Sequence, residues 1–388
     1  MMPWDFDCLV DRSRTESVKW RTYEPDVLPM WIADMDFSAP PAVIESLQER
    51  ISHGVLGYGM RPIALIEVLQ ERLGRLYGWK VPGEAFVFTP GVVTGFNLAA
   101  RSLHQPGGEL LIQTPVYPPF LKAAGHAGMT TRIQELSRGE QGSYEVNLDE
   151  FRRAVGLQTK AFLLCNPHNP VGRVFRRSEL EAMAEVCLNH HVPIISDEIH
   201  CDLIYPGHEH LPMASLSPDI ARQTITLVSP SKTFNLAGLE MAIVIIPDPE
   251  LRRGFEAARG GMVPASNVLS QVAALAAYRD GAEWLKSLLQ YLEANRNVVR
   301  KFVAEELPGI SMIEPEATFL AWLDCRGASL PDSPAQFFLK HARVALNDGK
   351  KFGPGGEGFV RLNFGCARRQ LLLALEKMAA ALLRRSHC

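Results

Sequence analysis

Short apolar segments alternate with amphipathic ones through the middle of the chain. Five segments are rich in branched apolar residues and have the length of buried strands: 109–113, 161–165, 193–196, 224–228 and 242–246. Between them, the spacing of residues 178–191 predicts a helix with Ser178 as its cap. This alternation predicts an α/β fold with a largely parallel sheet, which binds ligands beyond the carboxyl ends of its strands.

The last third of the chain has a different pattern. Residues 283–306 predict one long helix, followed by apolar segments at 318–323 and 358–362 and a closing helix from Arg368. A chain of 388 residues is also long for a single core. We therefore predict a large domain of residues 46–282 and a smaller α+β domain of residues 1–45 and 283–388.

Composition narrows the class of protein. Hydrophobic residues make up 47% and charged residues 21%, as in soluble globular proteins, and no apolar run approaches the roughly 20 residues of a membrane span. The formal net charge of -3 gives no reason to expect nucleic acid or a membrane as partner. The first residues, Met1-Met2-Pro3-Trp4, lack the features of a signal peptide, so a cytoplasmic protein is expected.

Cysteine and histidine patterns argue against structural cross-links. The 7 cysteines include no Cys-x-x-Cys pair, which predicts neither a disulfide framework nor a zinc site. His190-His191 and His208-Glu209-His210 have no companion cluster at ligand spacing, so solvated loops are the favoured interpretation. No metal is therefore expected.

Four side chains follow the ends of four successive predicted strands. They are the aromatic ring of Tyr117, the amide of Asn169, the carboxylate of Asp197 and the amine of Lys232. Such an amine can form a Schiff base with an aldehyde cofactor such as pyridoxal phosphate, and a carboxylate can hold its pyridinium N–H. Each residue also has an ordinary interpretation: a core tyrosine, a turn, a helix cap and a surface lysine. The combination favours the cofactor.

A phosphate site is the second candidate feature. The glycine turn Thr89-Pro90-Gly91-Val92-Val93-Thr94-Gly95 precedes a predicted helix at 96–103, whose first N–H groups would attract an anion. A purely structural turn needs the same glycines. Ser229 and Ser231, beside Lys232, would add hydroxyl donors. His200 follows Asp197 and would either hydrogen-bond a phenolic oxygen or pack in the core.

Together these motifs resemble the fold-type I pyridoxal phosphate enzymes of aminotransferase class I/II. Within them the likeness is to the MalY/PatB group of cystathionine β-lyases, or C–S lyases. The residues that carry it span nearly the whole chain: Lys19-Trp20, 33–37, Gly57-Tyr58, 167–172, 196–200, 229–235, 317–322 and Arg361-Leu362-Asn363. The resemblance implies a large domain with a mostly parallel seven-stranded sheet flanked by helices, and a smaller α+β domain.

The resemblance also implies roles around the cofactor, pyridoxal 5′-phosphate. Lys232 is similar to the lysine that forms the Schiff base and moves the proton at Cα of the substrate. Asp197 resembles the partner of the pyridine nitrogen, and Tyr117 the stacking ring. Asn169 resembles the partner of the ring hydroxyl oxygen, close to the substrate. His200 is grouped with the cofactor contacts.

Further implied contacts involve the phosphate and the substrate. Phosphate ligands would be the backbone turn and hydroxyls at Val92, Val93, Ser229 and Ser231. Tyr58 resembles the tyrosine that reaches the cofactor phosphate of a neighbouring subunit, which implies a homodimer with shared active sites. Arg361 resembles the arginine that binds the α-carboxylate of an amino-acid substrate, although from the residues alone it reads as a surface charge.

Two departures bear on the reaction. His200 stands three residues after Asp197, where aminotransferases often have tyrosine, and Glu240 stands where many have an arginine against the phosphate. The latter favours a lyase, which depends less on that anchor. The resemblance thus implies β-elimination of L-cystathionine or related cysteine S-conjugates to pyruvate, ammonia and a thiol. An aminotransferase, a cofactor-bearing regulator with residual lyase activity, and an inactive scaffold remain alternatives.

Overall fold

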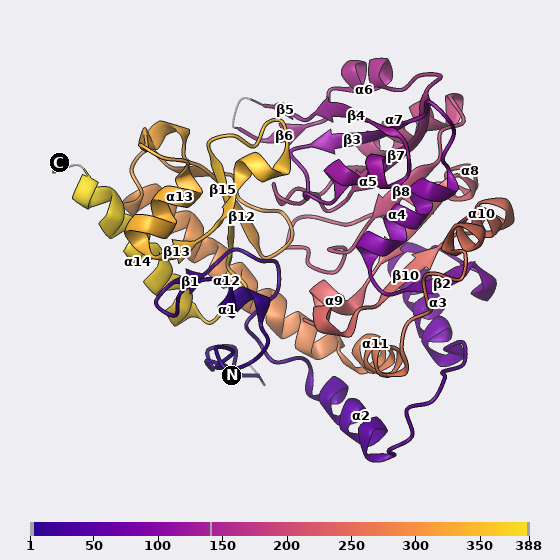
Figure 1. Cartoon of the computed structure of the whole chain (residues 1–388), viewed down its shortest axis with the longest axis horizontal. Coiled ribbons are helices and arrows are strands. Elements are labelled where there is room, and N and C mark those ends of the chain that lie inside the picture. The colour runs from indigo at the N-terminus through magenta and orange to yellow at the C-terminus, as the bar shows by residue number, and fades with distance from the viewer. Residues whose placement is uncertain (1–3, 140–141, 386–388) are drawn as a thin grey trace.

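A computed structural model of the protein describes residues 4–139 and 142–385. A seven-stranded sheet forms its larger part, to the right in Figure 1. Every strand runs parallel to the rest except β10, which is antiparallel to both neighbours. The strand order is β2 (Phe86–Thr89), β10 (Ala242–Ile245), β9 (Thr224–Val228), β8 (Ile194–Asp197), β7 (Thr159–Cys165), β3 (Glu109–Thr114) and β4 (Thr130–Glu135). The predicted α/β class and its largely parallel sheet are confirmed.

Helices cover both faces of this sheet because apolar residues of the inner strands alternate between them. Ile112 and Leu163 pack in the core under α4 (Val92–Ser102), α5 (Phe120–His126) and α10 (Pro249–Arg259). Leu111 and Phe162 pack in the core on the opposite side. The remaining helices of this part are α3 (Ile63–Tyr77), α6 (Leu148–Ala154), α7 (Arg177–Asn189), α8 (Pro218–Arg222) and α11 (Val268–Asp280).

The helix predicted with Ser178 as its cap begins at Arg177, so its cap lies two residues earlier than expected. Arg176 is the residue at the N-cap of α7, and its backbone N–H donates to the Glu179 carboxylate at 2.9 Å. Ser178 therefore lies inside the first turn, and the prediction that it caps the helix is wrong. A glutamate at the third helical position satisfies the free backbone donor instead.

A second sheet forms the smaller part, to the left in Figure 1. Its antiparallel order is β11 (Ser311–Met312), β12 (Leu320–Asp324), β15 (Phe359–Asn363) and β14 (Asn347–Asp348). The expected long helix is α12 (Ala282–Glu306), and the closing helix is α14 (Arg368–Arg385). The other elements, taken from both parts, are α1 (Val18–Arg21), α2 (Pro41–Ser52), α9 (Pro230–Thr233), α13 (Pro334–Phe337), β5 (Ser137–Arg138) and β6 (Tyr144–Glu145), with β1 (Leu28–Pro29) pairing with β13 (Val344–Ala345).

The division at 45/46 and 282/283 stays a prediction. Helix α2 runs across the first boundary, and α12 begins beside the second. In the part of the chain that the structure describes, no helix is long and apolar enough to cross a membrane. Within those same residues, no group of His, Cys, Asp or Glu side chains could hold a metal ion.

The loop at 208–210 differs from its prediction. His210 is buried, and its Nε2 lies 2.9 Å from the Glu198 carboxylate. The interpretation of this histidine as part of a solvated loop is therefore wrong. Its burial depends on a partner twelve residues away in the sequence, which local polarity does not reveal.

Candidate active site

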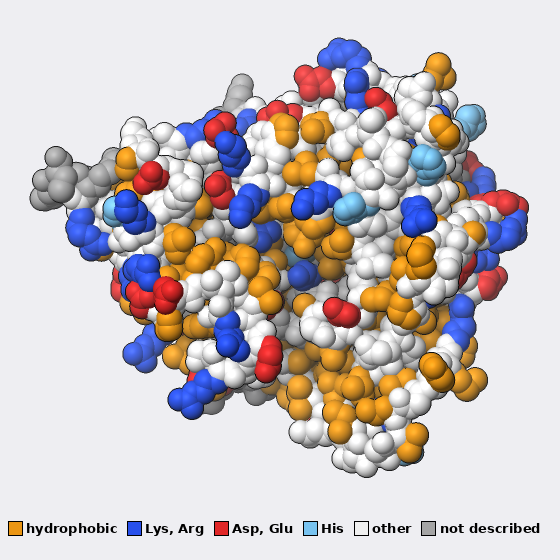
Figure 2. Space-filling view, in the orientation of Figure 1, with side chains coloured by type: hydrophobic (Ala, Val, Ile, Leu, Met, Phe, Trp, Pro, Cys, Tyr) orange, Lys and Arg blue, Asp and Glu red, His pale blue; other side chains and the backbone are white. Residues whose placement is uncertain are grey.

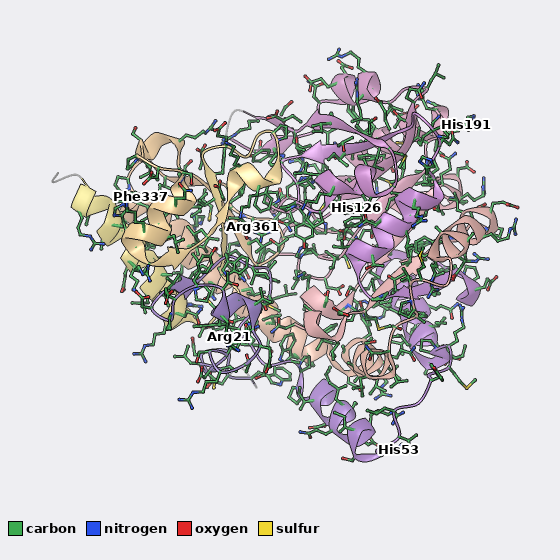
Figure 3. The ribbon with its side chains drawn as sticks, viewed as in Figure 1. Arg21, His53, His126, His191, Phe337 and Arg361 are labelled. Carbon is green, nitrogen blue, oxygen red and sulfur yellow. The ribbon has the colours of Figure 1, made fainter. Side chains whose placement is uncertain are left out.

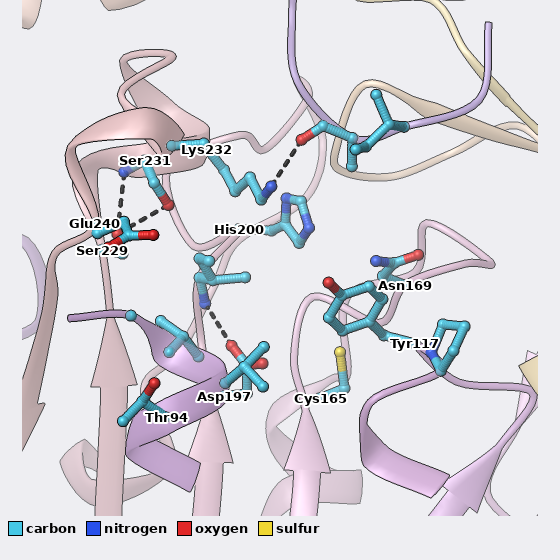
Figure 4. Close-up of a pocket in the computed structure, with 18 of the residues that line it drawn as sticks. Thr94, Tyr117, Cys165, Asn169, Asp197, His200, Ser229, Ser231, Lys232 and Glu240 are labelled. Carbon is cyan, nitrogen blue, oxygen red and sulfur yellow. Dashed lines mark hydrogen bonds between the residues drawn. The ribbon is translucent and has the colours of Figure 1, made fainter. Parts of the chain in front are cut away.

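A cavity of about 440 Å³ lies at the carboxyl end of the large sheet. The ends of β3, β7, β8 and β9, which are neighbours in the sheet, place four side chains in its wall: Tyr117, Asn169, Asp197 and Lys232 (Figure 4). Because parallel strands end at the same edge, residues 115 positions apart in the sequence meet here. The structure thus brings the four predicted residues together, while their roles stay predictions.

Lys232 lies in the short helix α9, directly after β9, and Ser229 caps this helix. Its Nζ donates to the backbone oxygen of Ala33 at 2.7 Å, the dashed line that leaves Lys232 in Figure 4. Among the described residues it forms no ion pair. Burial lowers the pKa of Lys232 to about 8, with the charge of Asp34 opposing and that of Arg361 assisting. A neutral amine is therefore accessible near physiological pH.

Asp197 ends β8 and is buried. Its Oδ1 accepts a hydrogen bond from the backbone N–H of Ile199 at 3.1 Å. Burial, with a smaller contribution from the neighbouring Glu198, raises the pKa of Asp197 to about 7. No helix follows it, so the helix-cap alternative is wrong. A buried carboxyl with spare acceptor sites fits a protonated ring nitrogen, which would supply the missing positive charge.

Tyr117 and His200 bring two rings to the cavity wall. Burial raises the pKa of the Tyr117 hydroxyl, which Figure 4 shows directed into the cavity. His200 is buried, and burial lowers its pKa to about 3, so its imidazole is neutral. Its Nδ1 has no hydrogen-bond partner among the described residues, and its ring packs edge-on to Phe319 at 6.2 Å between centroids. Both rings therefore have a free polar atom for a ligand.

Arg361 projects from β15 and is 3% exposed (Figure 3). Among the described residues its guanidinium donates only to neutral oxygens: Asn169 Oδ1 at 2.9 Å, Trp31 O at 3.0 Å and Asn347 Oδ1 at 2.6 Å. Burial lowers its pKa to about 10. The interpretation of Arg361 as a surface charge is wrong. Since a buried cation without a counterion is costly, the site fits a ligand that carries a carboxylate.

The start of α4 forms the corner of the cavity where the predicted phosphate ligands lie, which we call the phosphate corner. This helix begins at Val92 rather than at residue 96, so Val92 and Val93 lie in its first turn and not in a preceding loop. Gly91 is its N-cap and offers no side-chain acceptor, which leaves the first N–H groups free toward the cavity. Gly95 lies inside this helix at a position that needs glycine, because any Cβ there would lie 2.4 Å from the side chain of Leu227.

Ser229 and Ser231 line the cavity at the same corner (Figure 4). Their hydroxyl oxygens are 2.9 Å apart, and Ser229 Oγ also donates to Met241 O at 2.6 Å. Together with the α4 N-terminus they fit a phosphate group. Glu240 lines this part of the wall as well. The carboxylate noted in the sequence therefore does stand near the phosphate corner.

Tyr58 is the one predicted site residue that the structure leaves outside this cavity. It is fully exposed, in the segment between α2 and α3. Its predicted contact with a second subunit stays a prediction. The surrounding surface is apolar, as Figure 2 shows over α2 and α11 at the lower right, and includes Ile51, Val55, Leu56, Met60 and Ile63.

Some cavity residues escaped sequence reasoning. Ala33 and Trp31 take part through backbone oxygens, which any residue type would supply. The ring of Phe352 lies against the Arg361 guanidinium, with 5.0 Å between the ring centroid and Cζ of Arg361. The side-chain oxygen of Asn347 accepts a hydrogen bond from the same guanidinium. The segment 33–37 was noticeable only through the family likeness, since no pattern of side chains marks it as part of a site.

Comparisons with known proteins agree with this geometry. The aminotransferase class I and II family profile matches residues 25–378. Cystathionine beta-lyase PatB of Bacillus subtilis is 41% identical over 97% of this chain and 100% of that protein. Among solved structures, OvoB is 46% identical with a TM-score of 0.93, covering 98% of this chain and 99% of its own. The PLP-bound C–S lyase from Staphylococcus hominis is 33% identical with a TM-score of 0.92 over 98% and 99%.

The residues of the cavity fit the cofactor of the PLP-bound C–S lyase. An amine, a buried carboxyl, an aromatic ring and an anion corner surround one space, and they correspond to the aldehyde, ring nitrogen, ring face and phosphate of pyridoxal 5′-phosphate. The chain belongs to the aminotransferase class I and II family, and its cofactor is pyridoxal 5′-phosphate.

Proposed function

We propose that this chain is a carbon–sulfur lyase that catalyses β-elimination of L-cystathionine or related cysteine S-conjugates to pyruvate, ammonia and a thiol. The observation that carries the proposal is the pair of Lys232 and Arg361. A low-pKa amine and a buried guanidinium without a counterion face one cavity. The relative PatB, named a cystathionine β-lyase and matched over the full length, supports elimination as the outcome.

Arg361 would bind the α-carboxylate of the substrate with two parallel hydrogen bonds, which sets the Cα–H bond near Lys232. Lys232, as a neutral amine, takes the proton from Cα. The bound cofactor supplies the electron sink for the charge at Cα. Asp197 would hold the proton at the ring nitrogen, and the neutral His200 and Tyr117 would donate or accept nearby hydrogen bonds.

The overall reaction is a balanced elimination. The Cα–H bond breaks with its proton passing to Lys232 Nζ, and the Cβ–S bond breaks with its electron pair leaving on sulfur. A thiolate and 2-aminoacrylate result, and water converts the latter to pyruvate and ammonia. No external oxidant or second amino acceptor is required, which separates this reaction from amino transfer.

Pyruvate release from L-cystathionine, with no 2-oxo acid present, tests the proposal. A lyase gives sustained pyruvate with an equal amount of free thiol. The proposal is overturned if neither product appears and amino transfer follows only after a 2-oxo acid is added. Cysteine S-conjugates of different size, measured in the same assay, then define the substrate.

We also propose a homodimer with shared active sites, in which Tyr58 of each copy serves the cofactor of the other. The exposed apolar surface around Tyr58 supports it, because such a surface is stable in water only when covered. Mixing a Lys232→Ala variant with a Tyr58→Ala variant is the test. Mixed dimers contain one intact site, so recovery of up to about a quarter of wild-type activity is expected. No recovery under conditions of subunit exchange would contradict the arrangement.

A further inference from the structure

Several motifs of the sequence have no role in the cavity itself. They are Lys19, Asp36, and the two asparagines that follow the cationic site residues, Asn235 after Lys232 and Asn363 after Arg361. In the structure Lys19, Asn235 and Asn363 all contact residues 31–37, a segment without helix or strand that contains Asp36. Because these residues have no role in the cavity wall and all contact or belong to one segment, we expect them to share a function.

The two asparagines hold the backbone of this segment. The Asn363 amide donates to Ile32 O at 2.6 Å and to Asp34 O at 2.7 Å, the two carbonyls on either side of Ala33. The Asn235 amide donates to Met35 O at 2.9 Å and Phe37 O at 2.7 Å. Asn235 Oδ1 also accepts from the Met35 N–H at 3.0 Å.

A buried ion pair anchors the far side of the segment. Lys19 Nζ donates to the Asp36 carboxylate at 2.8 Å, and both side chains are buried. Trp20 Nε1 at 2.9 Å and Arg12 Nη1 at 2.7 Å donate to the same carboxylate. With each carboxylate oxygen bonded, the segment has little freedom to shift.

On the side that faces the cavity, residues 31–37 present carbonyl oxygens to the two cationic side chains, Lys232 and Arg361. Ala33 O accepts from Lys232 Nζ at 2.7 Å, and Trp31 O accepts from Arg361 Nη2 at 3.0 Å. A carbonyl orients a cation without cancelling its charge. Arg361 therefore keeps its charge for a substrate carboxylate, and the Lys232 amine is not locked as an ammonium by a buried carboxylate.

We propose that residues 31–37 position the two catalytic cations relative to each other, and that Asn235 and Asn363 are positioning residues that act through this segment. Lys232 follows a strand of the large sheet and Arg361 lies in a strand of the small one, and the segment contacts both side chains. The inference rests on the proposed roles of Lys232 and Arg361, but it does not depend on which reaction follows proton removal.

The test compares Asn363→Ala with Asn295→Ala. Asn295 is a matched control: it is also buried in the small part, and its amide donates to two carbonyls that lie outside residues 31–37, Phe364 O at 3.0 Å and Cys366 O at 2.8 Å. Both variants lose two donors, so both should lower the thermal midpoint by similar amounts.

The decisive readout is the reactivity of Lys232 toward trace acetic anhydride against pH, measured by mass spectrometry on the full chain freed of cofactor. The charged and titratable groups facing Lys232 are Asp34, Asp197, His200 and Arg361, and none of them is changed. Asn363→Ala should lower the titration midpoint of Lys232 by about half a unit or more, because a loosened Ala33 carbonyl stabilises the ammonium less. Asn295→Ala should leave it unchanged.

A Lys232 midpoint in Asn363→Ala equal to wild type, or an equal shift in Asn295→Ala, would overturn the proposal. Asn235→Gly is the second variant if Asn363→Ala does not fold, since Asn235 has a φ of 57° that glycine adopts without strain. It should shift the midpoint in the same direction. In the cofactor-loaded enzyme, Asn363→Ala should also raise the KM for the amino acid at least about fivefold, whereas Asn295→Ala should not. Labelling needs no substrate, so failure of this inference is distinguishable from failure of the lyase assignment.

Discussion

Two lysines contact the same segment of backbone and differ in their counterions. Lys19 pairs with the Asp36 carboxylate at 2.8 Å, and its side chain is fully buried. Within the part of the chain that the structure describes, Lys232 Nζ donates only to the Ala33 carbonyl, and burial lowers its pKa to about 8. The first arrangement neutralises a charge and fixes the backbone. The second leaves an amine whose proton is easily exchanged, so burial without a counterion distinguishes the reactive lysine from the structural one.

A similar contrast holds for two neighbouring carboxyl groups at the end of β8, those of Asp197 and Glu198. Glu198 points away from the cavity and accepts three hydrogen bonds, from Ser196 at 2.8 Å, His210 at 2.9 Å and the Met213 N–H at 3.0 Å. Asp197 faces the cavity and accepts one, from the Ile199 N–H. The saturated carboxylate supports the fold, and the unsaturated one has room for a ligand.

The largest effect that we expect is the loss of activity when Lys232, the reactive lysine, is replaced. Lys232→Ala should lower turnover at least about 10³-fold, because a proton transfer by a positioned group is lost. Its thermal midpoint should stay within a few degrees of wild type, since no ion pair is broken. Pyruvate release and thermal unfolding on the same preparation check this. Turnover near the wild-type rate would remove Lys232 from the mechanism.

Lys19→Met tests the second lysine of the comparison, the structural one, through the stability of the fold. It leaves the buried Asp36 without its fully buried cation and should lower the free energy of unfolding by about 3 kcal/mol. Lys301, which is exposed and pairs weakly with Glu305 at 3.9 Å, provides the matched control. Lys301→Met should cost less than about 0.5 kcal/mol in urea unfolding. Equal losses in the two variants would contradict the structural role of Lys19.

Arg361→Ala tests the unpaired guanidinium. Loss of two charge-assisted hydrogen bonds to a substrate carboxylate should lower kcat/KM by about 100-fold, mostly through KM. Because no protein carboxylate loses its partner, stability should change little. Steady-state kinetics of pyruvate release measure the effect. An unchanged KM would mean that the substrate carboxylate binds elsewhere.

Asp197 should make the stability of the cofactor-free chain depend on pH. Burial raises the pKa of Asp197 from 3.8 to about 7, so the folded chain holds a proton that the unfolded chain releases. The free energy of unfolding therefore falls as the pH rises from about 4 to about 7, by about 2 kcal/mol between pH 5 and pH 7. Asp197→Asn should lose this slope. Identical urea midpoints against pH in the two proteins would contradict it.

The hydrophobic periodicity of the sequence predicted the helices and strands more accurately than the sequence predicted the contacts within the site. The strand at 224–228 and the helix ending at 306 match the structure, because buried strands and long amphipathic helices have strong patterns. The start of α4 was missed because Gly91 and Gly95 are typical of turns, whereas Gly95 here gives room for Leu227.

The site was predictable where side chains carry the chemistry. Lys232, Asp197, Asn169 and Tyr117 could be predicted because each has a chemically distinctive side chain shortly after a predicted strand. The Ala33 carbonyl has no such signature, since every residue has one. Burial of Arg361 depends on residues that the small sheet and the 31–37 segment bring to it, which no local pattern reveals.

The central claim is that Lys232 moves the Cα proton of a bound amino acid. Exchange of the Cα proton of L-alanine with D2O, followed by NMR, tests it directly because L-alanine has no leaving group and isolates this step. The account predicts steady exchange by the wild-type holoenzyme and a rate at least about 100-fold lower in Lys232→Ala. Exchange at the wild-type rate in that variant would contradict it.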